Sequence, residues 1–281
     1  MGLTNYHIHS DFCDGHASME EFVQEAVRKG LKAIAFSSHS PVPYHTDWNL
    51  PEHKMDDYLK EIRRLKEKYQ GTIDIYASLE VDYIDGVQGP GDEKYRSLGL
   101  DFIMGSIHFL GNYDDGSPWQ IDCPVPEFMK GFREIYGGDA KYLVRTYFET
   151  TREMIRTSTP DILAHMDRVK MHNNIEPVFD ESENWYRDEL RHTLEVIKEK
   201  DVIVEINTKA VLRNGMIYPG SEYFKWIREL DIPIVMNSDA HRPGNLIDGF
   251  KETAEMLIAK GIKHKLEFID EEWKAVKIEI Q

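Results

Sequence analysis

The segment LTNYHIH, residues 3–9, shows the pattern from which the fold can be inferred. It is a short apolar, β-prone run that ends in two histidines, His7 and His9, spaced two residues apart. Six further runs of this kind contain or lead into a histidine or a carboxylate. Lengths of about five to nine residues are typical of buried strands. The seven runs cover residues 3–9, 31–38, 73–81, 101–108, 161–165, 202–207 and 232–237.

Charged, amphipathic segments between these runs predict helices. Ser18 and Glu21 have the spacing of a capping box, and Gly30 follows as a stop signal. Strands that alternate with helices predict a parallel α/β fold, for which a closed barrel and an open doubly wound sheet are both possible. The expected helices cover residues 18–29, 56–69, 141–157, 185–199, 221–230 and 245–260.

The strand ends favour the barrel. Side chains two residues apart in a strand point to the same side, so His7 can act with His9, and Asp239 with His241. A barrel brings all carboxyl ends of its strands to one rim, whereas an open sheet spreads them over ~25–30 Å at ~4.8 Å per strand. One shared metal site therefore requires the barrel. The residues expected at this rim are His7, His9, His16, His39, Glu80, His108, His165, Glu205, Asp239 and His241.

Composition excludes several classes of function. The 281 residues include 34 Lys and Arg against 50 Asp and Glu, a net charge of −16, which argues against a nucleic-acid partner. We expect no membrane span, because no apolar run approaches the roughly 18–20 residues required. The two cysteines form no CxxC pair, and the first residues do not resemble a secretory signal. A cytoplasmic, single-domain protein covering residues 1–281 is expected; its oligomeric state is not predicted.

Seven short motifs, in order along the chain, resemble the PHP (polymerase and histidinol phosphatase) superfamily. Within it, the CDGH form of the first motif and the length of the chain are most similar to the monofunctional histidinol-phosphate phosphatases. The motifs are HIHSDFCDGHAS (7–18), FSSHS (36–40), SLEVDY (78–83), MGSIHFL (104–110), DILAHMDRV (161–169), EINT (205–208) and NSDAH (237–241).

The resemblance implies a distorted (β/α)7 TIM-like barrel with a trinuclear centre at its C-terminal rim. One ion would be held by His7, His9, Glu80 and Asp239, a second by Glu80, His108 and His165, and a third by His16, His39 and His241. Three divalent ions are expected, as Zn, Mn or Fe, because imidazole and carboxylate donors do not specify one metal. Such a centre would hydrolyse L-histidinol phosphate, in histidine biosynthesis, through a metal-activated hydroxide.

Several residues beside the metal ligands are candidates for binding and catalysis. Glu80 would bridge two ions, and Asp239 or His241 would deliver a proton to the leaving alcohol. Arginine matches the oxygens of a phosphate, and the sequence favours Arg213 and Arg168 over Arg242.

A rim insertion at about residues 111–139 is expected to help in substrate recognition or to cover the barrel. Its candidate contacts are Asp115, Trp119, Asp122 and Tyr136, and the loop 46–53 rises from the same rim.

Two other functions stay open at this point. A PHP phosphoesterase could act on a different phosphorylated metabolite or on a nucleotide. A non-catalytic metal-binding PHP module is the alternative from another class, and the full set of expected ligands argues against it.

Overall fold

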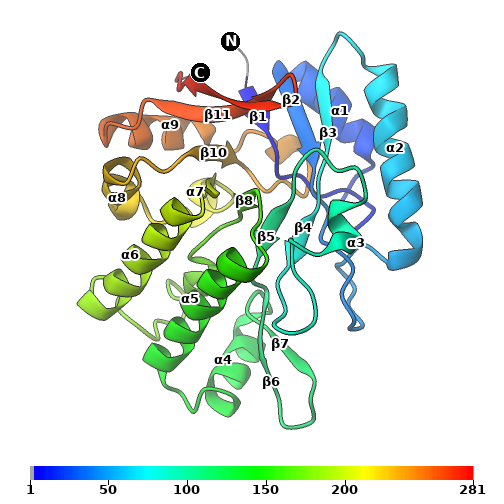
Figure 1. Cartoon of the computed structure of the whole chain (residues 1–281). Helices are drawn as coiled ribbons and strands as arrows, with labels where there is room; N and C mark the ends of the chain where they lie inside the picture. Colours follow the sequence, from blue (N-terminus) through cyan, green and yellow to red (C-terminus); the bar gives the residue numbers. More distant parts are fainter. Residues whose placement is uncertain (1–2, 281) are drawn as a thin grey trace.

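The computed structural model describes residues 3–280, in which parallel strands alternate with helices (Figure 1). The strands are β1 (Leu3–Asn5), β2 (Leu31–Phe36), β3 (Asp74–Ala77), β4 (Glu80–Asp82), β5 (Met104–Ser106), β6 (Phe109–Asn112), β7 (Pro118–Gln120), β8 (Ile162–Leu163), β9 (Ile203–Asn207), β10 (Ile234–Asn237), β11 (His264–Ile269) and β12 (Glu272–Lys277). The helices are α1 (Met19–Arg28), α2 (Met55–Lys68), α3 (Glu93–Arg96), α4 (Val125–Glu134), α5 (Ala140–Thr157), α6 (Asn184–Glu199), α7 (Val211–Asn214), α8 (Phe224–Glu229) and α9 (Phe250–Ala259).

The central strands form two parallel sheets, in the orders β1-β2-β3 and β10-β9-β8-β5-β4. Isolated parallel bridges connect the sheets in two places. Ile8 pairs with Ala240 just beyond β1 and β10, and His39 beyond β2 pairs with Glu80 of β4. At the first bridge His9 N donates to Ala240 O at 2.9 Å. The predicted parallel α/β class is confirmed, although no continuous strand ladder runs through all the described strands.

The strands are shorter than the apolar runs predicted, and most of the histidines follow the strand ends. β1 ends at Asn5, before His7 and His9, and β5 ends at Ser106, before His108. Burial on both faces explains the continuous apolar runs, since all five residues of β9 are buried. The seven predicted runs thus correspond to strands followed by irregular segments that carry the polar side chains.

The helix predictions are confirmed apart from their ends. The capping box at Ser18 and Glu21 is present, and α1 follows it. The segment 221–230 begins as a 3₁₀ turn, Ser221–Tyr223, and continues as α8. The helix expected from residue 245 begins only at Phe250, because Gly249 (φ +73°) introduces a left-handed step before it.

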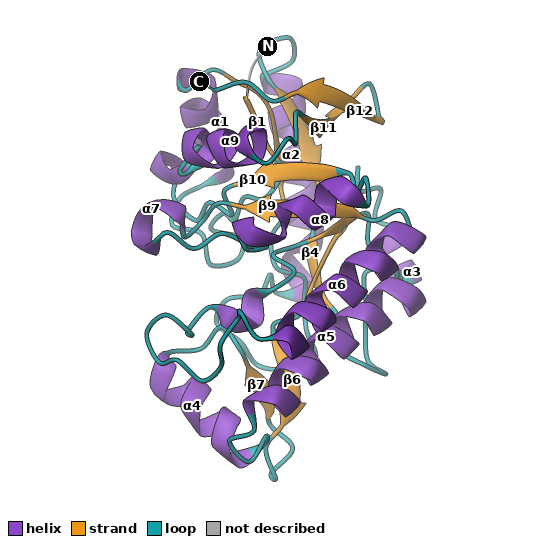
Figure 2. Ribbon diagram, turned by 90° about the vertical axis from the view of Figure 1, so that its left-hand side faces the viewer, coloured by secondary structure: helices purple, strands orange, loops and turns teal. Residues whose placement is uncertain are grey.

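The hairpin β11–β12 near the chain ends was not predicted as a separate element. It packs aromatic rings under the strands, with Trp273 5.6 Å from Tyr6 and Phe268 5.4 Å from Phe102, measured between ring centroids. Figures 1 and 2 place this hairpin at one end of the molecule, and β6, β7 and α4 at the other.

The insertion at 111–139 is a folded element rather than an open loop. It contains most of the hairpin β6–β7 and the helix α4, and its side chains join the largest hydrophobic cluster. The Trp119 ring packs directly on α4, since a Cβ on Gly131 would lie 2.2 Å from Trp119 Nε1. The insertion is therefore anchored by buried aromatic packing.

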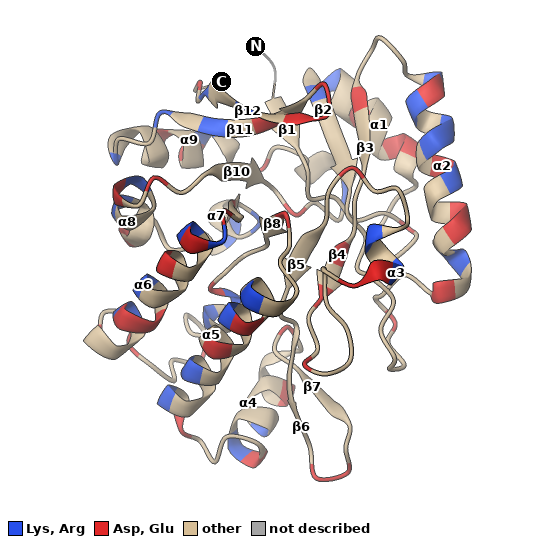
Figure 3. Cartoon of the chain, in the orientation of Figure 1, with Lys and Arg blue, Asp and Glu red and all other residues tan. Residues whose placement is uncertain are grey.

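Figure 3 shows acidic and basic residues interspersed along the outer helices α2, α5 and α6. Within residues 3–280, no helix combines the length and apolar character that crossing a membrane requires.

Substitution of Tyr58, in α2, tests how hydrogen bonds from this helix stabilise the ends of the strands. Its buried hydroxyl lies 2.8 Å from Phe36 O and 2.7 Å from Ser78 O, at the ends of β2 and β3. Tyr58→Phe removes the one hydroxyl proton that these carbonyls share and the oxygen that accepts from Ser38 N at 3.3 Å, so we expect a loss of about 1–3 kcal/mol in the free energy of unfolding by urea. Tyr142→Phe, at a residue 56% exposed, is the control and should be neutral. Equal stability of both variants would contradict this role.

Candidate metal centre

His7 and His9 extend from the end of β1 into the candidate site. Both side chains are fully buried, and their ring centroids lie 5.0 Å apart. His7 Nε2 lies 3.2 Å from Glu80 Oε2, and His9 Nε2 lies 3.3 Å from Asp239 Oδ1. The pair expected from the His-x-His spacing therefore faces two carboxylates from distant segments.

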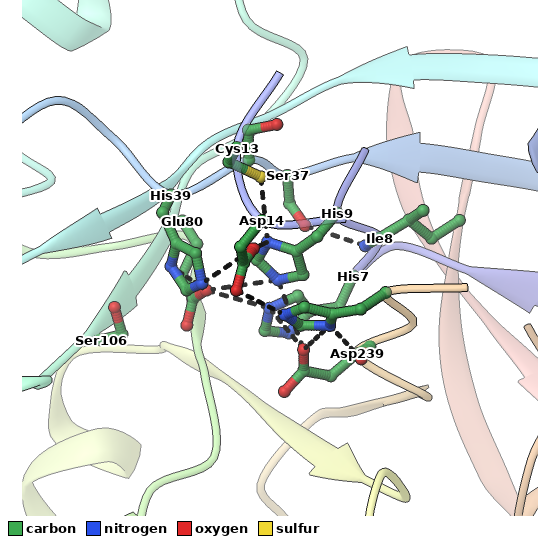
Figure 4. A network of polar contacts seen from close by, with 12 residues as sticks. His7, Ile8, His9, Cys13, Asp14, Ser37, His39, Glu80, Ser106 and Asp239 are labelled. Atoms are coloured by element: carbon green, nitrogen blue, oxygen red, sulfur yellow. Dashed lines mark hydrogen bonds and ion pairs between the residues drawn. The ribbon is translucent and has the colours of Figure 1, made fainter. Parts of the chain in front are cut away.

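Glu80 is the buried centre of the group. Its Oε1 lies 2.8 Å from His165 Nε2 and 3.6 Å from His108 Nε2. Its Oε2 lies 3.0 Å from His39 Nδ1, in addition to the contact with His7. Four separate segments thus direct imidazoles at one carboxylate. Figure 4 shows part of this arrangement, with His7, His9, Asp14, His39, Glu80 and Asp239 turned toward one another.

Asp14, rather than His16, joins the group from the first motif. Ligand atoms of Asp14, His9, His39 and His241 lie within 4.8 Å of one another, and Asp14 Oδ2 lies 3.1 Å from His241 Nε2. His16 is exposed, and it belongs to no such group among residues 3–280. The structure therefore brings Asp14, and not His16, into the group with His9, His39 and His241.

The turn after His9 explains this difference. A Cβ on Gly15 would lie only 2.1 Å from His9 O, so the chain passes too close for any other residue. Gly15 N donates to Ser10 O at 3.0 Å and tightens the turn. Strand alternation does not hold in such a turn, and Asp14 points inward while His16 points outward.

Several donor atoms in the group are buried and have no hydrogen-bond partner within the described part of the chain. They are His9 Nε2, Asp14 Oδ1, His39 Nδ1 and His165 Nδ1. Leaving such atoms unpaired costs roughly 1–3 kcal/mol each. A divalent cation would satisfy His9 Nε2, Asp14 Oδ1 and His39 Nδ1, whereas His165 directs its other ring nitrogen, Nε2, at Glu80. The mixture of imidazole and carboxylate donors suits Zn, Mn or Fe. The residues therefore fit a metal centre.

Carboxylates behind the group orient two of its imidazoles. Glu205 Oε1 lies 2.7 Å from His7 Nδ1, and Asp82 Oδ1 lies 2.8 Å from His108 Nδ1. Such contacts fix the ring orientation and leave Nε2 facing the site. Glu205 was expected at the rim, whereas the role of Asp82 was missed.

Two members of the group have a strained backbone. His165 has φ 22° and Asp239 has φ 50°, values that residues other than glycine adopt at a cost of about 1–3 kcal/mol. The bond from His165 N to Glu205 Oε2 (2.9 Å) helps to hold the first of them. Strain at two candidate ligands indicates that the surrounding fold fixes their direction.

The environment also separates the pKa values of neighbouring groups. Burial lowers the pKa of His9, and the adjacent His241 lowers it further, which favours the neutral form that can bind a metal. Burial also opposes charge on His7, but Glu205 and the other nearby carboxylates outweigh it and hold the His7 pKa well above its ordinary value. Burial disfavours ionised Glu80, yet the surrounding imidazoles hold its pKa well below its usual range.

A cavity of about 350 Å³ opens beside the group. The loop 46–53 and the insertion form its outer wall, where Trp48 Nε1 donates to Gln120 Oε1 at 3.1 Å. Lys209, which follows β9 and was not a candidate from the sequence, also lines the cavity. Trp48 lies in the loop already expected at this rim, whereas only the tertiary structure identifies Lys209.

The three candidate arginines lie in two different places. Arg168 lines the cavity, and its Nε and Nη2 lie 2.9 and 2.7 Å from Asp122 Oδ2. Arg213 and Arg242 are exposed and line a neighbouring cavity of about 550 Å³ together with His16. Only Arg168 of the three lies in the cavity with His108 and His165.

The four candidate residues of the insertion lie in different environments. Asp122 lines the cavity, whereas Trp119 and Tyr136 are buried in the hydrophobic cluster. Asp115 is exposed and accepts a hydrogen bond from Ser117 N at 2.9 Å. Of these residues, only Asp122 lines this cavity.

The fold and the site define an α/β protein with a candidate metal centre built from histidines and carboxylates. The PHP domain family matches residues 5–209, almost three quarters of the sequence, and the chain belongs to this family.

Relatives that resemble the chain over most of its length carry one functional name. A Deinococcus radiodurans protein named "Probable histidinol-phosphatase" is 29% identical over 262 residues, which cover 89% of this chain and 90% of the relative. The Bacillus subtilis protein named "Histidinol-phosphatase" is 26% identical over 255 residues, or 85% and 94% of the two chains.

Two solved structures share the fold. A Listeria monocytogenes protein assigned as a histidinol phosphatase superposes with a TM-score of 0.78 at 21% identity, covering 89% of this chain and 99% of its own. The Lactococcus lactis histidinol phosphate phosphatase has a TM-score of 0.70 at 18% identity, with coverage of 96% and 98%. That structure contains zinc, L-histidinol and phosphate.

The two candidates in the first motif can be separated by substitution. Asp14→Ala should lower the number of ions that the protein retains and reduce turnover at least ~100-fold, as expected when a metal ligand is lost. His16→Ala, two residues away and exposed, is the matched control and should keep its ions. Metal analysis after gel filtration measures both. Loss of metal from His16→Ala but not from Asp14→Ala would reverse the assignment.

Proposed function

We propose that this chain is a metal-dependent phosphomonoesterase that hydrolyses L-histidinol phosphate to L-histidinol and phosphate. The observation that carries the proposal is the buried group centred on Glu80, which opens into a cavity containing Arg168. The chain belongs to the PHP family, and the two relatives described above, both named as histidinol-phosphatases, match it over 89% and 85% of its length. This supports a hydrolase that acts in histidine biosynthesis.

We also propose that the strands close into a distorted seven-stranded barrel, with the metal centre at its C-terminal rim. Support comes from the bridges between Ile8 and Ala240 and between His39 and Glu80, which connect the two parallel sheets. In this proposal β3 and β4 count as one interrupted strand, and the domain extends over residues 1–281 with the insertion at 111–139.

Three metal positions are proposed, as Zn, Mn or Fe. The first uses His7, His9, Glu80 and Asp239; the second uses Glu80, His108 and His165; the third uses His39, His241 and Asp14. Bound divalent ions would activate water for attack on phosphorus and neutralise charge on the phosphoryl oxygens. Their charge would also attract an anionic substrate to a protein whose net charge is −16.

The side chains around the cavity would then orient the substrate. Arg168 donates from Nε and Nη2 to one oxygen of Asp122, and its Cζ lies 5.3 Å from the centroid of the Tyr218 ring. These contacts hold the guanidinium beside the site. The planar guanidinium suits two phosphate oxygens. Asp122 Oδ1 is buried without a partner in the described chain, and it can accept a hydrogen bond from a cationic group of the alcohol.

The leaving alcohol must gain a proton. Glu80 is enclosed by imidazoles, whereas Asp239 and His241 line the cavity. We therefore assign proton delivery to Asp239 or His241, acting directly or through a water that they hold, and assign to Glu80 the role of joining the metal positions.

Phosphate release is the decisive assay. Protein loaded in turn with Mn, Zn or Fe(II) should release phosphate from L-histidinol phosphate with a far higher kcat/KM than from sugar phosphates, nucleotides or an aryl phosphate. High activity on another member of this panel would support a phosphoesterase with a different substrate. Bound metal without any phosphate release would instead support the non-catalytic module.

The two arginine positions give a second test. Arg168→Ala should raise the KM for the phosphoester by roughly 10–100-fold, the effect of losing charge-assisted hydrogen bonds. Arg213→Ala removes the same charge from the neighbouring cavity and should change KM less than about threefold, within the effect of a screened surface charge. Steady-state kinetics with both variants decides the order, and the opposite pattern would place the phosphate at Arg213.

A further inference from the structure

Lys209 lies against the metal centre although the proposed function assigns it no role. Its Nζ is 3.0 Å from Asp239 Oδ1 and 3.4 Å from His241 Nε2. Within the described chain Asp239 is its only ion-pair partner. The ammonium group therefore depends on this corner of the site for its charge compensation.

The atoms that Lys209 contacts are the ones that a metal would use. Asp239 Oδ1 also lies 3.3 Å from His9 Nε2, and His241 Nε2 lies 3.1 Å from Asp14 Oδ2. An ammonium has three donors and no lone pair, so it can only occupy the lone pairs of these atoms. Like charges a few ångströms apart also repel strongly where water is scarce. One corner cannot hold both the ammonium and a divalent ion.

The Lys209 side chain can leave this corner without disturbing the backbone. Lys209 N donates to Asn207 Oδ1 at 3.1 Å, which fixes the main chain beyond β9. The side chain itself is 25% exposed and lines both the 350 Å³ cavity and the neighbouring 550 Å³ cavity. A flexible four-carbon stem can therefore move the ammonium into open space beside Arg168.

We infer that Lys209 competes with a metal ion for the corner formed by Asp239 and His241, and that metal binding transfers its ammonium to the cavity, where it binds phosphoryl oxygens. The inference rests on the proposed function in that it requires a metal centre. It makes Lys209 an internal competitor that weakens one metal position. It also makes the cavity more cationic once that position is filled.

Metal titration tests the competition without using turnover. Apo-protein is titrated with Mn²⁺ at fixed pH and ionic strength, and free Mn²⁺ is followed by its paramagnetic resonance signal. In Lys209→Met the weakest ion should bind about 10-fold more tightly, because one charge-assisted contact no longer has to be broken. Lys209→Arg keeps the competing charge and should retain the weaker binding. Lys251→Met, at an exposed lysine of α9, controls for the change in net charge and should match the wild type.

Unchanged or weaker binding in a folded Lys209→Met protein would overturn the competition. If that variant does not fold, the retained weak binding of Lys209→Arg is compared with Lys209→Gln, which removes the charge but keeps a polar side chain. Equal affinity in these two variants would also overturn the proposal.

Binding of inorganic phosphate tests the second part of the inference, that the displaced ammonium binds phosphoryl oxygens. At saturating Mn²⁺, phosphate should bind roughly 10-fold more weakly to Lys209→Met than to the wild type, measured by calorimetry. Equal phosphate affinity of Lys209→Met and the wild type would contradict the transfer of the ammonium to the cavity. If Lys209→Met changes both the Mn²⁺ and the phosphate affinity as expected, but the wild type does not hydrolyse L-histidinol phosphate, the proposed function fails while this inference stands. If hydrolysis is normal and substitution of Lys209 changes neither affinity, this inference fails while the proposed function stands.

Discussion

The buried carboxylate of Glu80 is the constraint on which the rest of the structure depends. Removing an ionised carboxylate from water costs several kcal/mol, even after the surrounding protein relaxes. Only cations or strong donors directed at both oxygens can offset that cost, and the imidazoles of His7, His39, His108 and His165 supply them. These histidines come from separate strand ends, so the order and register of the strands must place every end within a few ångströms of one point.

The same requirement explains features that would weaken an ordinary core. His165 and Asp239 adopt unfavourable φ values, and several ligand-type atoms are buried without a hydrogen-bond partner in residues 3–280. Each costs free energy in the protein alone. Apolar packing around the strands and the aromatic layer beneath them, which includes Tyr6 and Trp273, stabilises the fold enough to hold these groups in place.

Much of this could be predicted from sequence because it follows local periodicity. The spacing of His7 and His9 indicated a shared direction, and alternating strands and helices indicated the parallel fold. That Asp14 rather than His16 points into the group could not be predicted, because a tight turn at Gly15 sets the direction of both side chains. Lys209 meets Asp239 only through the pairing of β9 with β10, which no local pattern encodes.

The origin of the outer cavity wall has a consequence for how this scaffold diversifies. Trp48, Gln120 and Asp122 come from two segments that contribute none of the groups placed around Glu80, and the Trp119 ring fixes one segment through packing on α4. The loop 46–53 is thus built separately from the residues around Glu80, whereas Asp122 is tied to the site through its pair with Arg168. Under the proposed function, exchange of the loop 46–53 alone would alter contacts to the alcohol and leave the metal centre in place, so one scaffold would serve several phosphoesters.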